Sequence, residues 1–66
     1  MKPVVTMAFH IQKLENIQGQ LKEIYYQGDY RWNTDYDVRK IYETEEEAQA
    51  DLYSFGGEVS AVIIGE

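Results

Sequence analysis

The chain of 66 residues contains no cysteine, and it has a single histidine and a single proline. Without cysteine no disulfide can form, so the fold depends on packing or on a partner, and the composition suits a reducing compartment. The lone histidine has no second ligand of its kind for a zinc site. The sequence also shows no catalytic constellation and no phosphate-binding loop. We therefore expect no metal and no cofactor.

Long hydrophobic runs are missing as well. The apolar stretch at residues 59–64 is interrupted by Ser60 and is far shorter than the roughly 20 residues of a membrane-spanning helix. Residues 1–3 lead directly into a strand-like pattern, without the ordered regions of a signal peptide. We expect a soluble, cytoplasmic protein that does not enter a membrane.

Basic residues are few, since six lysines and arginines face twelve acidic residues and the net charge is −6. Residues 1–28 carry three lysines and two glutamates, a sum of +1, whereas residues 29–66 carry three basic residues and ten carboxylates, a sum of −7. A negative field repels phosphate backbones, so we expect no direct binding of nucleic acid. The acidic half is either a solvated face or a surface presented to a basic protein partner.

What is present is enough apolar material for one folded domain, residues 1–66. Hydrophobic residues make up 44% of the chain and aromatic residues 14%, which is too apolar for a disordered protein. A chain this short buries only about 60% of its unfolded surface, so its stability is expected to be marginal.

The first segment, residues 4–12, alternates with the period of two that is typical of a half-buried strand. Four apolar side chains fall on one face and are expected to point inward: Val5, Met7, Phe9 and Ile11. His10 falls on the other face, where we expect it to be an ordinary surface residue.

Residues 12–27 allow two interpretations. Heptad spacing of apolar residues suits an amphipathic helix, but Gly19 lies in its interior and would cost about 1 kcal/mol relative to alanine. The polar stretch at residues 15–20 instead resembles a hairpin loop, with a second strand at residues 21–27. We favour the hairpin. A turn at residues 27–30 and a short third strand at residues 30–32 follow.

The second half of the chain contains the clearest local signal. Thr44 and Glu47 form a capping box that predicts a helix over residues 44–55, with Gly56 and Gly57 as its stop. An apolar stripe of Ala48, Leu52 and Phe55 would face the sheet, and we expect Leu52 to be buried. An extended piece at residues 39–43 precedes the helix. The last strand, residues 58–65, is apolar on both faces and is expected inside the sheet.

Together these elements predict an α+β fold. A small antiparallel sheet, with the chain order β-β-β-β-α-β, would be covered on one face by the single helix.

The polar break at residues 33–37 has the spacing of a calcium loop. Asn33, Asp35 and Asp37 match its first positions, but Val38 replaces the required glycine and Thr44 the required acid. We expect these side chains to accept hydrogen bonds from their own backbone instead.

Several short motifs resemble a pattern found in small phage and prophage accessory proteins. They are Tyr25-Tyr26-Gln27-Gly28, Trp32, residues 35–40, Ile41-Tyr42-Glu43-Thr44 with Glu47-Ala48, and Gly56-Gly57-Glu58-Val59. The resemblance covers residues 9–62, and Arg39 departs from it where the pattern usually has alanine. It implies an antiparallel meander covered by one helix, in proteins mostly of unknown function. Some of their phage neighbours inhibit host defence or transcription machinery by binding it.

Tyrosine and tryptophan are concentrated in the middle of the chain, with seven such residues between positions 25 and 53. These residue types are enriched at protein interfaces and on single-strand stacking platforms, but the acidic surroundings disfavour nucleic acid. We therefore expect a non-enzymatic protein that binds and modulates a host or phage protein with a basic surface. The expected partner-binding residues are Asp29, Tyr30, Asp35, Tyr36 and Asp37.

The alternative from a different class is a structural or assembly role, in which the protein forms a homodimer by self-association at a sheet edge. Salt separates the two, because binding to a basic partner weakens with ionic strength whereas an apolar edge contact does not. An enzyme is not expected, since surface carboxylates occur here without a base, nucleophile or metal set.

Overall fold

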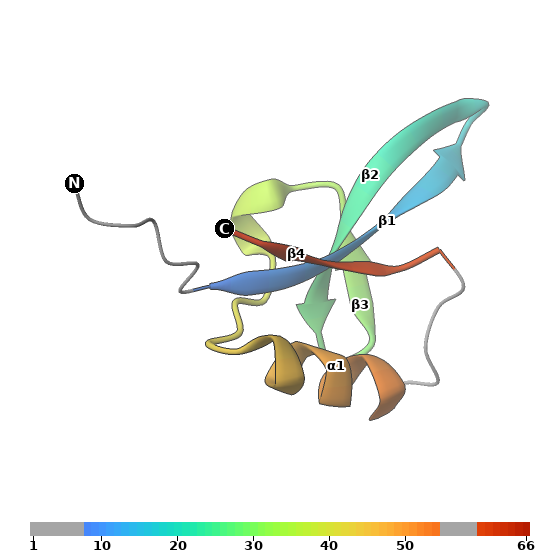
Figure 1. The fold of residues 1–66 in the computed structure, drawn as a ribbon. Helices are drawn as coiled ribbons and strands as arrows, with labels where there is room; N and C mark the ends of the chain where they lie inside the picture. Colours follow the sequence, from blue (N-terminus) through green and yellow to red (C-terminus); the bar gives the residue numbers. More distant parts are fainter. Residues whose placement is uncertain (1–7, 55–59) are drawn as a thin grey trace.

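The computed structural model describes residues 8–54 and 60–66, which contain one four-stranded sheet and one α-helix (Figure 1). The elements in chain order are β1 (Phe9–Ile17), β2 (Gln20–Gly28), β3 (Arg31–Asn33), the 3₁₀ turn η1 (Tyr36–Val38), α1 (Glu45–Ser54) and β4 (Val62–Gly65). All strand pairs are antiparallel, and the order across the sheet is β3-β2-β1-β4. The predicted α+β fold class, an antiparallel sheet with one helix, is confirmed.

Residues 12–27 form a hairpin and not a helix. The strands are paired from Gln12 with Tyr25 as far as Ile17 with Gln20, so the loop is shorter than the polar stretch suggested. Gln18 and Gly19 form the two-residue turn with φ of 51° and 84°. A turn with positive φ at both central positions matches the twist of the flanking strands, and glycine adopts it without strain.

The expected fourth strand at residues 39–43 is a single β-bridge. Pairing between β1 and β2 stops at Gln12 and Tyr25, and the last residues of β2 pair only with β3. There the connector from Lys40 to Tyr42 lies between β1 and β2. Tyr42 exchanges two backbone hydrogen bonds with Phe9, of 2.8 and 2.9 Å, and the Lys40 N–H donates to the Tyr26 carbonyl at 2.8 Å. The prediction of a strand was wrong, because the connector bonds to β1 only at Phe9 and to β2 only at Tyr26.

Helix α1 begins where the capping box predicted, since the Thr44 hydroxyl accepts a hydrogen bond from the Glu47 N–H at 3.1 Å. Its buried residue is Ala48, and the helix packs on one face of the sheet. The buried cluster is Ile11, Tyr26, Tyr42 and Ala48, with Phe9, Trp32, Leu52, Ala61 and Ile63 partly buried against it. Within residues 8–54 and 60–66, no helix has the length and apolar character needed to cross a membrane.

Some predictions fall outside the described residues: the orientations of Val5 and Met7, and the end of the helix at Phe55, Gly56 and Gly57. Ile11 faces inward as predicted, and Phe9 does so in part.

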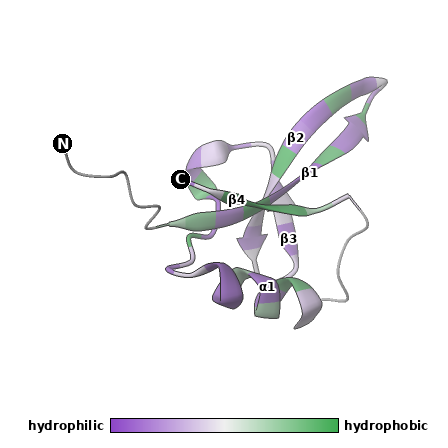
Figure 2. Cartoon of the chain, in the orientation of Figure 1, coloured by the Kyte–Doolittle hydropathy of each residue, from purple (hydrophilic) through white to green (hydrophobic). Residues whose placement is uncertain are grey.

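Strand β4 was expected inside the sheet and instead forms one of its edges. It pairs with β1, and its Val62 side chain is 49% exposed. Both faces of β4 are apolar because Ile63 packs on the core beneath the sheet while Ile64 lies opposite His10 on the other face. Most residues of β4 are therefore hydrophobic (Figure 2).

Leu52 is half-buried and contacts the core cluster, so it is less enclosed than the stripe predicted. We expect Leu52→Ala to lower the free energy of unfolding by about 2 kcal/mol, the low end for leucine truncation. Urea denaturation followed by circular dichroism measures this loss. Leu21→Ala, at an exposed leucine of the hairpin, is the matched control and should cost under about 0.5 kcal/mol. Equal losses for the two variants would show that the stripe does not hold α1 on the sheet.

Candidate functional site

The five residues predicted to bind a partner lie in two places. Asp29 and Tyr30 form the turn between β2 and β3, whereas Asp35, Tyr36 and Asp37 lie in or next to η1, after β3 has ended. In Figure 1 the turn lies at the lower end of β3, and η1 follows its upper end. All five are exposed, but the structure brings only the last three together.

The η1 segment has the local structure that its sequence predicted. The Asn33 side-chain oxygen accepts from the Asp35 N–H at 2.8 Å, and the Asp35 carboxylate accepts from the Asp37 N–H at 2.9 Å. These two side chains thus shape the backbone. In the parts of the chain that the structure describes, no three histidine or acidic side chains converge to hold a metal ion.

Tyr36 holds η1 against the sheet. Its hydroxyl donates to the Glu66 carboxylate at 2.8 Å, and the guanidinium of Arg39 lies 3.6 Å from the centre of its ring. The ring also meets those of Tyr25 and His10 edge-on, at 5.2 and 5.7 Å between centroids. The hydrogen bond to Glu66 is the main cause that raises the Tyr36 pKa. The Tyr36 side chain therefore makes these contacts with other residues of the same chain.

His10 is 2% exposed, and the prediction of a surface histidine was wrong. Its side chain does point to the face opposite the core, as the alternation of β1 predicted, but Tyr36 and Tyr25 cover it there. Ring nitrogen Nδ1 lies 2.9 Å from a Glu66 oxygen, and Nε2 lies 2.8 Å from the Gln12 amide oxygen. The pattern of a strand cannot show that a later segment returns to cover its polar face.

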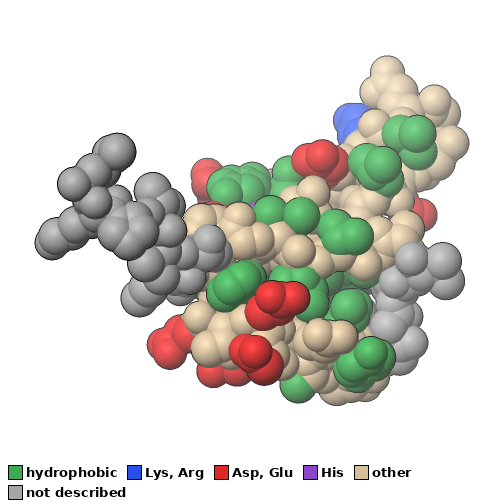
Figure 3. Space-filling model, viewed as in Figure 1, with side chains coloured by type: hydrophobic (Ala, Val, Ile, Leu, Met, Phe, Trp, Pro, Cys, Tyr) green, Lys and Arg blue, Asp and Glu red, His purple; other side chains and the backbone are tan. Residues whose placement is uncertain are grey.

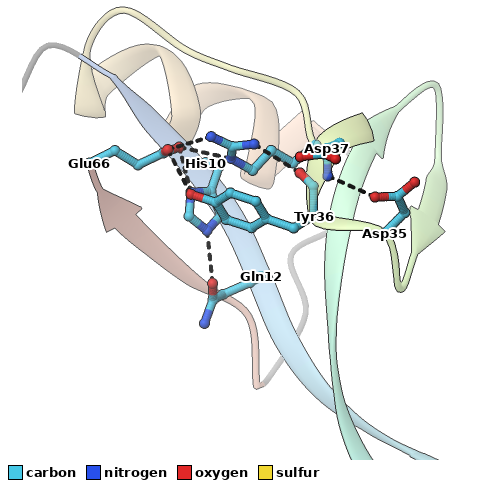
Figure 4. Close-up of polar contacts among 7 residues, drawn as sticks. His10, Gln12, Asp35, Tyr36, Asp37 and Glu66 are labelled. Carbon is cyan, nitrogen blue, oxygen red and sulfur yellow. Dashed lines mark hydrogen bonds and ion pairs between the residues drawn. The ribbon is translucent and has the colours of Figure 1, made fainter.

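On the face of the sheet opposite the core, the Glu66 carboxylate accepts hydrogen bonds from several side chains (Figure 4). Its carboxylate accepts from Arg39 through Nε at 2.9 Å and through Nη2, from the Tyr36 hydroxyl, and from His10. The hydrogen bonds from Arg39 contribute most to lowering the Glu66 pKa, to about 2. The Glu66 N–H also donates to the Ala8 carbonyl at 2.8 Å, which extends the pairing of β4 with β1. We call His10, Gln12, Tyr36, Arg39 and Glu66 the Glu66 cluster.

The Glu66 cluster contains residue types that also occur in active sites, but its geometry is that of a structural clamp. Both nitrogens of His10 are bonded within the protein, and the residue is buried. The Arg39 guanidinium is held by Glu66 and by the Tyr36 carbonyl. The cluster therefore joins η1, β1 and the end of β4 on the face opposite α1.

A second polar group fastens α1 to the connector. Asp51 accepts from the Tyr42 hydroxyl, from Lys40 Nζ at 3.1 Å and from the Ser54 hydroxyl at 3.1 Å. The hydrogen bond from Tyr42 is the largest cause that lowers the Asp51 pKa, while burial raises the pKa of Tyr42. An open groove of about 480 Å³ lies over this group, lined by Lys40, Ile41, Tyr42, Glu47, Ala50, Asp51 and Ser54.

Sequence reasoning missed both groups, because their members are distant in the chain and belong to ordinary surface residue types. Arg39 and its partner Glu66, for example, are 27 positions apart in the chain.

Comparison with protein-family models, with curated proteins and with solved structures finds no match to this chain.

Proposed function

We propose that this chain is a non-enzymatic interaction protein of the phage accessory type, which binds and modulates a protein with a basic surface. Tyr30 is the aromatic anchor of the proposed surface and Asp29 lies beside it, whereas Asp35 and Asp37 form a second acidic group beyond the other end of β3 (Figure 1). The observation that carries the proposal is the conformation of Tyr30, which is 74% exposed and has a φ of 63°.

A left-handed backbone is unusual for a bulky aromatic residue and costs roughly 1–2 kcal/mol. Glycine or asparagine would adopt the same turn at lower cost. The Tyr30 N–H donates to the buried Tyr26 hydroxyl at 3.1 Å, which helps to hold the turn in place. Strain of this kind is concentrated at functional sites, where the surrounding structure maintains it. A strained tyrosine that is largely open to solvent is therefore better explained by binding than by folding.

The two other exposed tyrosines differ from Tyr30. Tyr36 is 43% exposed, but its hydroxyl bonds to Glu66 and its ring stacks on Arg39, so its contacts already position η1. Tyr53 is 72% exposed but lies in the regular helix α1, with no unusual backbone. These differences support Tyr30 as the proposed anchor, and Tyr53 serves as a matched comparison.

The acidic residues beside Tyr30 and beyond the other end of β3 favour a basic partner. The three glutamates at the start of α1 follow from the capping box and the helix dipole, whereas folding gives no reason for Asp29 to be acidic. At Asp35 and Asp37, asparagine would equally serve the local turn. An exposed tyrosine with a charged rim has the composition of an interface centre.

We expect Tyr30→Ala to weaken partner binding about thirtyfold or more, the loss typical of an interface hot spot. Tyr53→Ala should leave binding unchanged. The partner is first recovered by affinity capture and mass spectrometry, and the affinities of both variants are then measured by calorimetry. Binding should weaken as salt rises, because the rim charges are exposed. If Tyr53→Ala abolishes binding while Tyr30→Ala retains it, the surface lies on α1 instead.

Two charge-neutralising triples refine the same test. Asp29/Asp35/Asp37→Asn keeps the acceptors that shape the turns, and Glu45/Glu46/Glu47→Gln removes equal charge from the helix. Circular dichroism confirms that both remain folded. The triple at Asp29, Asp35 and Asp37 should weaken binding, and lower its salt dependence, more than the triple on the helix. A larger effect of the helix triple would contradict the proposal.

A further inference from the structure

The two edges of the sheet differ in how they are protected. Strand β3 has only three residues and includes the exposed Arg31. Its pairing with β2 also has a register shift between Tyr26 and Gly28. Short strands, charges and bulges are the usual devices that stop an edge from pairing with another chain. Strand β4 is also short, with four residues, but residues 60–65 include no charge and no proline, and its pairing with β1 shows no irregularity. Among the described residues, β4 is therefore the less protected edge of the sheet.

The hydrogen-bond pattern identifies which backbone groups of β4 face outward. The Glu66 N–H donates to the Ala8 carbonyl, so these two residues form a hydrogen-bonded pair. Such pairs alternate along an antiparallel ladder, which makes Ile64 and His10 the next one. Ile63, between them, must point its N–H and C=O away from β1.

Phe9 provides an independent check of this alternation. It lies opposite Gly65, and both its N–H and its C=O bond to Tyr42 on the side of β1 away from β4. Gly65 therefore also directs its backbone groups outward. Within residues 8–54 and 60–66, no backbone group pairs with the outer side of Ile63 or Gly65.

The side chains along this edge are apolar. Val62 is 49% exposed, and hydrophobic side chains form a band across the middle of the face on which β4 crosses in front of the sheet (Figures 1 and 3). The rest of the molecule carries a net charge of −6, which keeps copies apart wherever the acidic residues face one another. Two copies can approach at β4 without bringing like charges opposite each other within residues 60–65.

We propose that β4 pairs antiparallel with β4 of a second copy of this chain, with the two-fold axis at Ile63. In this register Ile63 exchanges backbone hydrogen bonds with its own counterpart, and Val62 lies opposite the second copy's Ile64. The edge is self-complementary, because each copy supplies the same outward groups at alternate residues and the same neutral side chains. A strand with charged side chains would find no opposite charge within residues 60–65, so its charge would give it no advantage over a second copy of this chain.

The contact involves about five residues from each copy, which is smaller than a standard interface and predicts a dissociation constant of about 100 µM. The proposal is independent of partner binding at Tyr30, because the β2–β3 turn belongs to the opposite side of the strand order. Tyr30→Ala should leave the dimer unchanged, so the two proposals fail separately.

Sedimentation equilibrium on the purified chain measures the dimer, and amide exchange by NMR locates it. Between about 10 µM and about 1 mM protein, exchange of the Ile63 N–H should slow about fourfold as the dimer fills. The Ile64 N–H, which is bonded to β1, is the internal control and should not change. Exchange that is slowed at Ile64 and not at Ile63 would contradict the register.

Val62→Lys places a charge beside the pairing edge and should raise the dissociation constant about tenfold or more. Leu21→Lys makes the same change at an exposed leucine near the hairpin turn and should alter it by less than about twofold. A monomer at about 1 mM, a dimer insensitive to Val62→Lys, or protection of Ile63 only after another protein is added would each overturn the proposal. If Val62→Lys does not fold, the exchange of Ile63 in the unaltered chain decides the question alone.

Discussion

Replacing Ile11 with alanine is expected to unfold a large part of the protein at room temperature. Ile11 is 0% exposed and is the largest side chain that is completely enclosed among the described residues. Truncating a buried isoleucine costs about 2–5 kcal/mol, because the transfer energy is lost and the surrounding residues close the cavity only in part. A domain of this length has about 3–10 kcal/mol in total. A loss near the middle of the first range would thus consume much of the stability.

The matched control is Ile41→Ala, the same substitution at an isoleucine of the connector that is 49% exposed. It should cost less than about 1 kcal/mol. Urea denaturation followed by the fluorescence of Trp32, which packs against the core cluster, measures both variants. Equal losses would show that Ile11 is not the centre of the core.

Replacing Glu66 with glutamine is expected to lower the free energy of unfolding at pH 7 by about 2 kcal/mol. The carboxylate accepts charge-assisted bonds from Arg39 and further bonds from Tyr36 and His10, and glutamine offers them a neutral acceptor. The Glu66 side chain is partly open to solvent, which keeps the loss below that of a fully buried pair. Glu43→Gln, at an exposed carboxylate, should cost under about 0.5 kcal/mol.

The effect of Glu66 should depend on pH in one direction. Its pKa falls from the ordinary 4.5 to about 2 in the folded chain, so the unfolded chain binds the proton more tightly. The stabilisation is complete above about pH 4.5 and is lost as the pH falls toward 2. The difference between the unaltered chain and Glu66→Gln should therefore shrink over this range in urea titrations. A difference that stays constant down to pH 2 would show that the charge of Glu66 contributes nothing.

The parts of the fold that were predicted correctly depend on local chemistry. Thr44 and Glu47 are three residues apart, and their hydrogen bond sets the start of α1 wherever the helix packs. Gly19 permits the hairpin turn by its own conformation. The turns through Asn33 and Asp35 are equally local. Each of these features involves residues close enough in sequence for their types and spacing to be informative.

The features that were predicted wrongly depend on which distant segment lies beside a strand. The alternation of β1 placed His10 on the correct face but could not show that η1 covers it. The apolar character of β4 gave no information on strand order, so its edge position was missed. In the candidate site, Tyr30 and Tyr36 are alike in sequence, and they are distinguished by the backbone and exposure of Tyr30 and by the contacts of Tyr36 with Glu66 and Arg39.

Strand β1 has one neighbour close in sequence and another far from it. It meets β2 through the two-residue turn at Gln18 and Gly19, whereas its contact between His10 and Glu66 spans 56 positions. Closing a long loop costs more entropy than closing a hairpin, so the β1–β4 half of the sheet is the slower half to assemble. Contacts that form late in folding mainly slow unfolding. Glu66 therefore acts on the lifetime of the native state, and stopped-flow mixing should show Glu66→Gln as faster unfolding with little change in the folding rate.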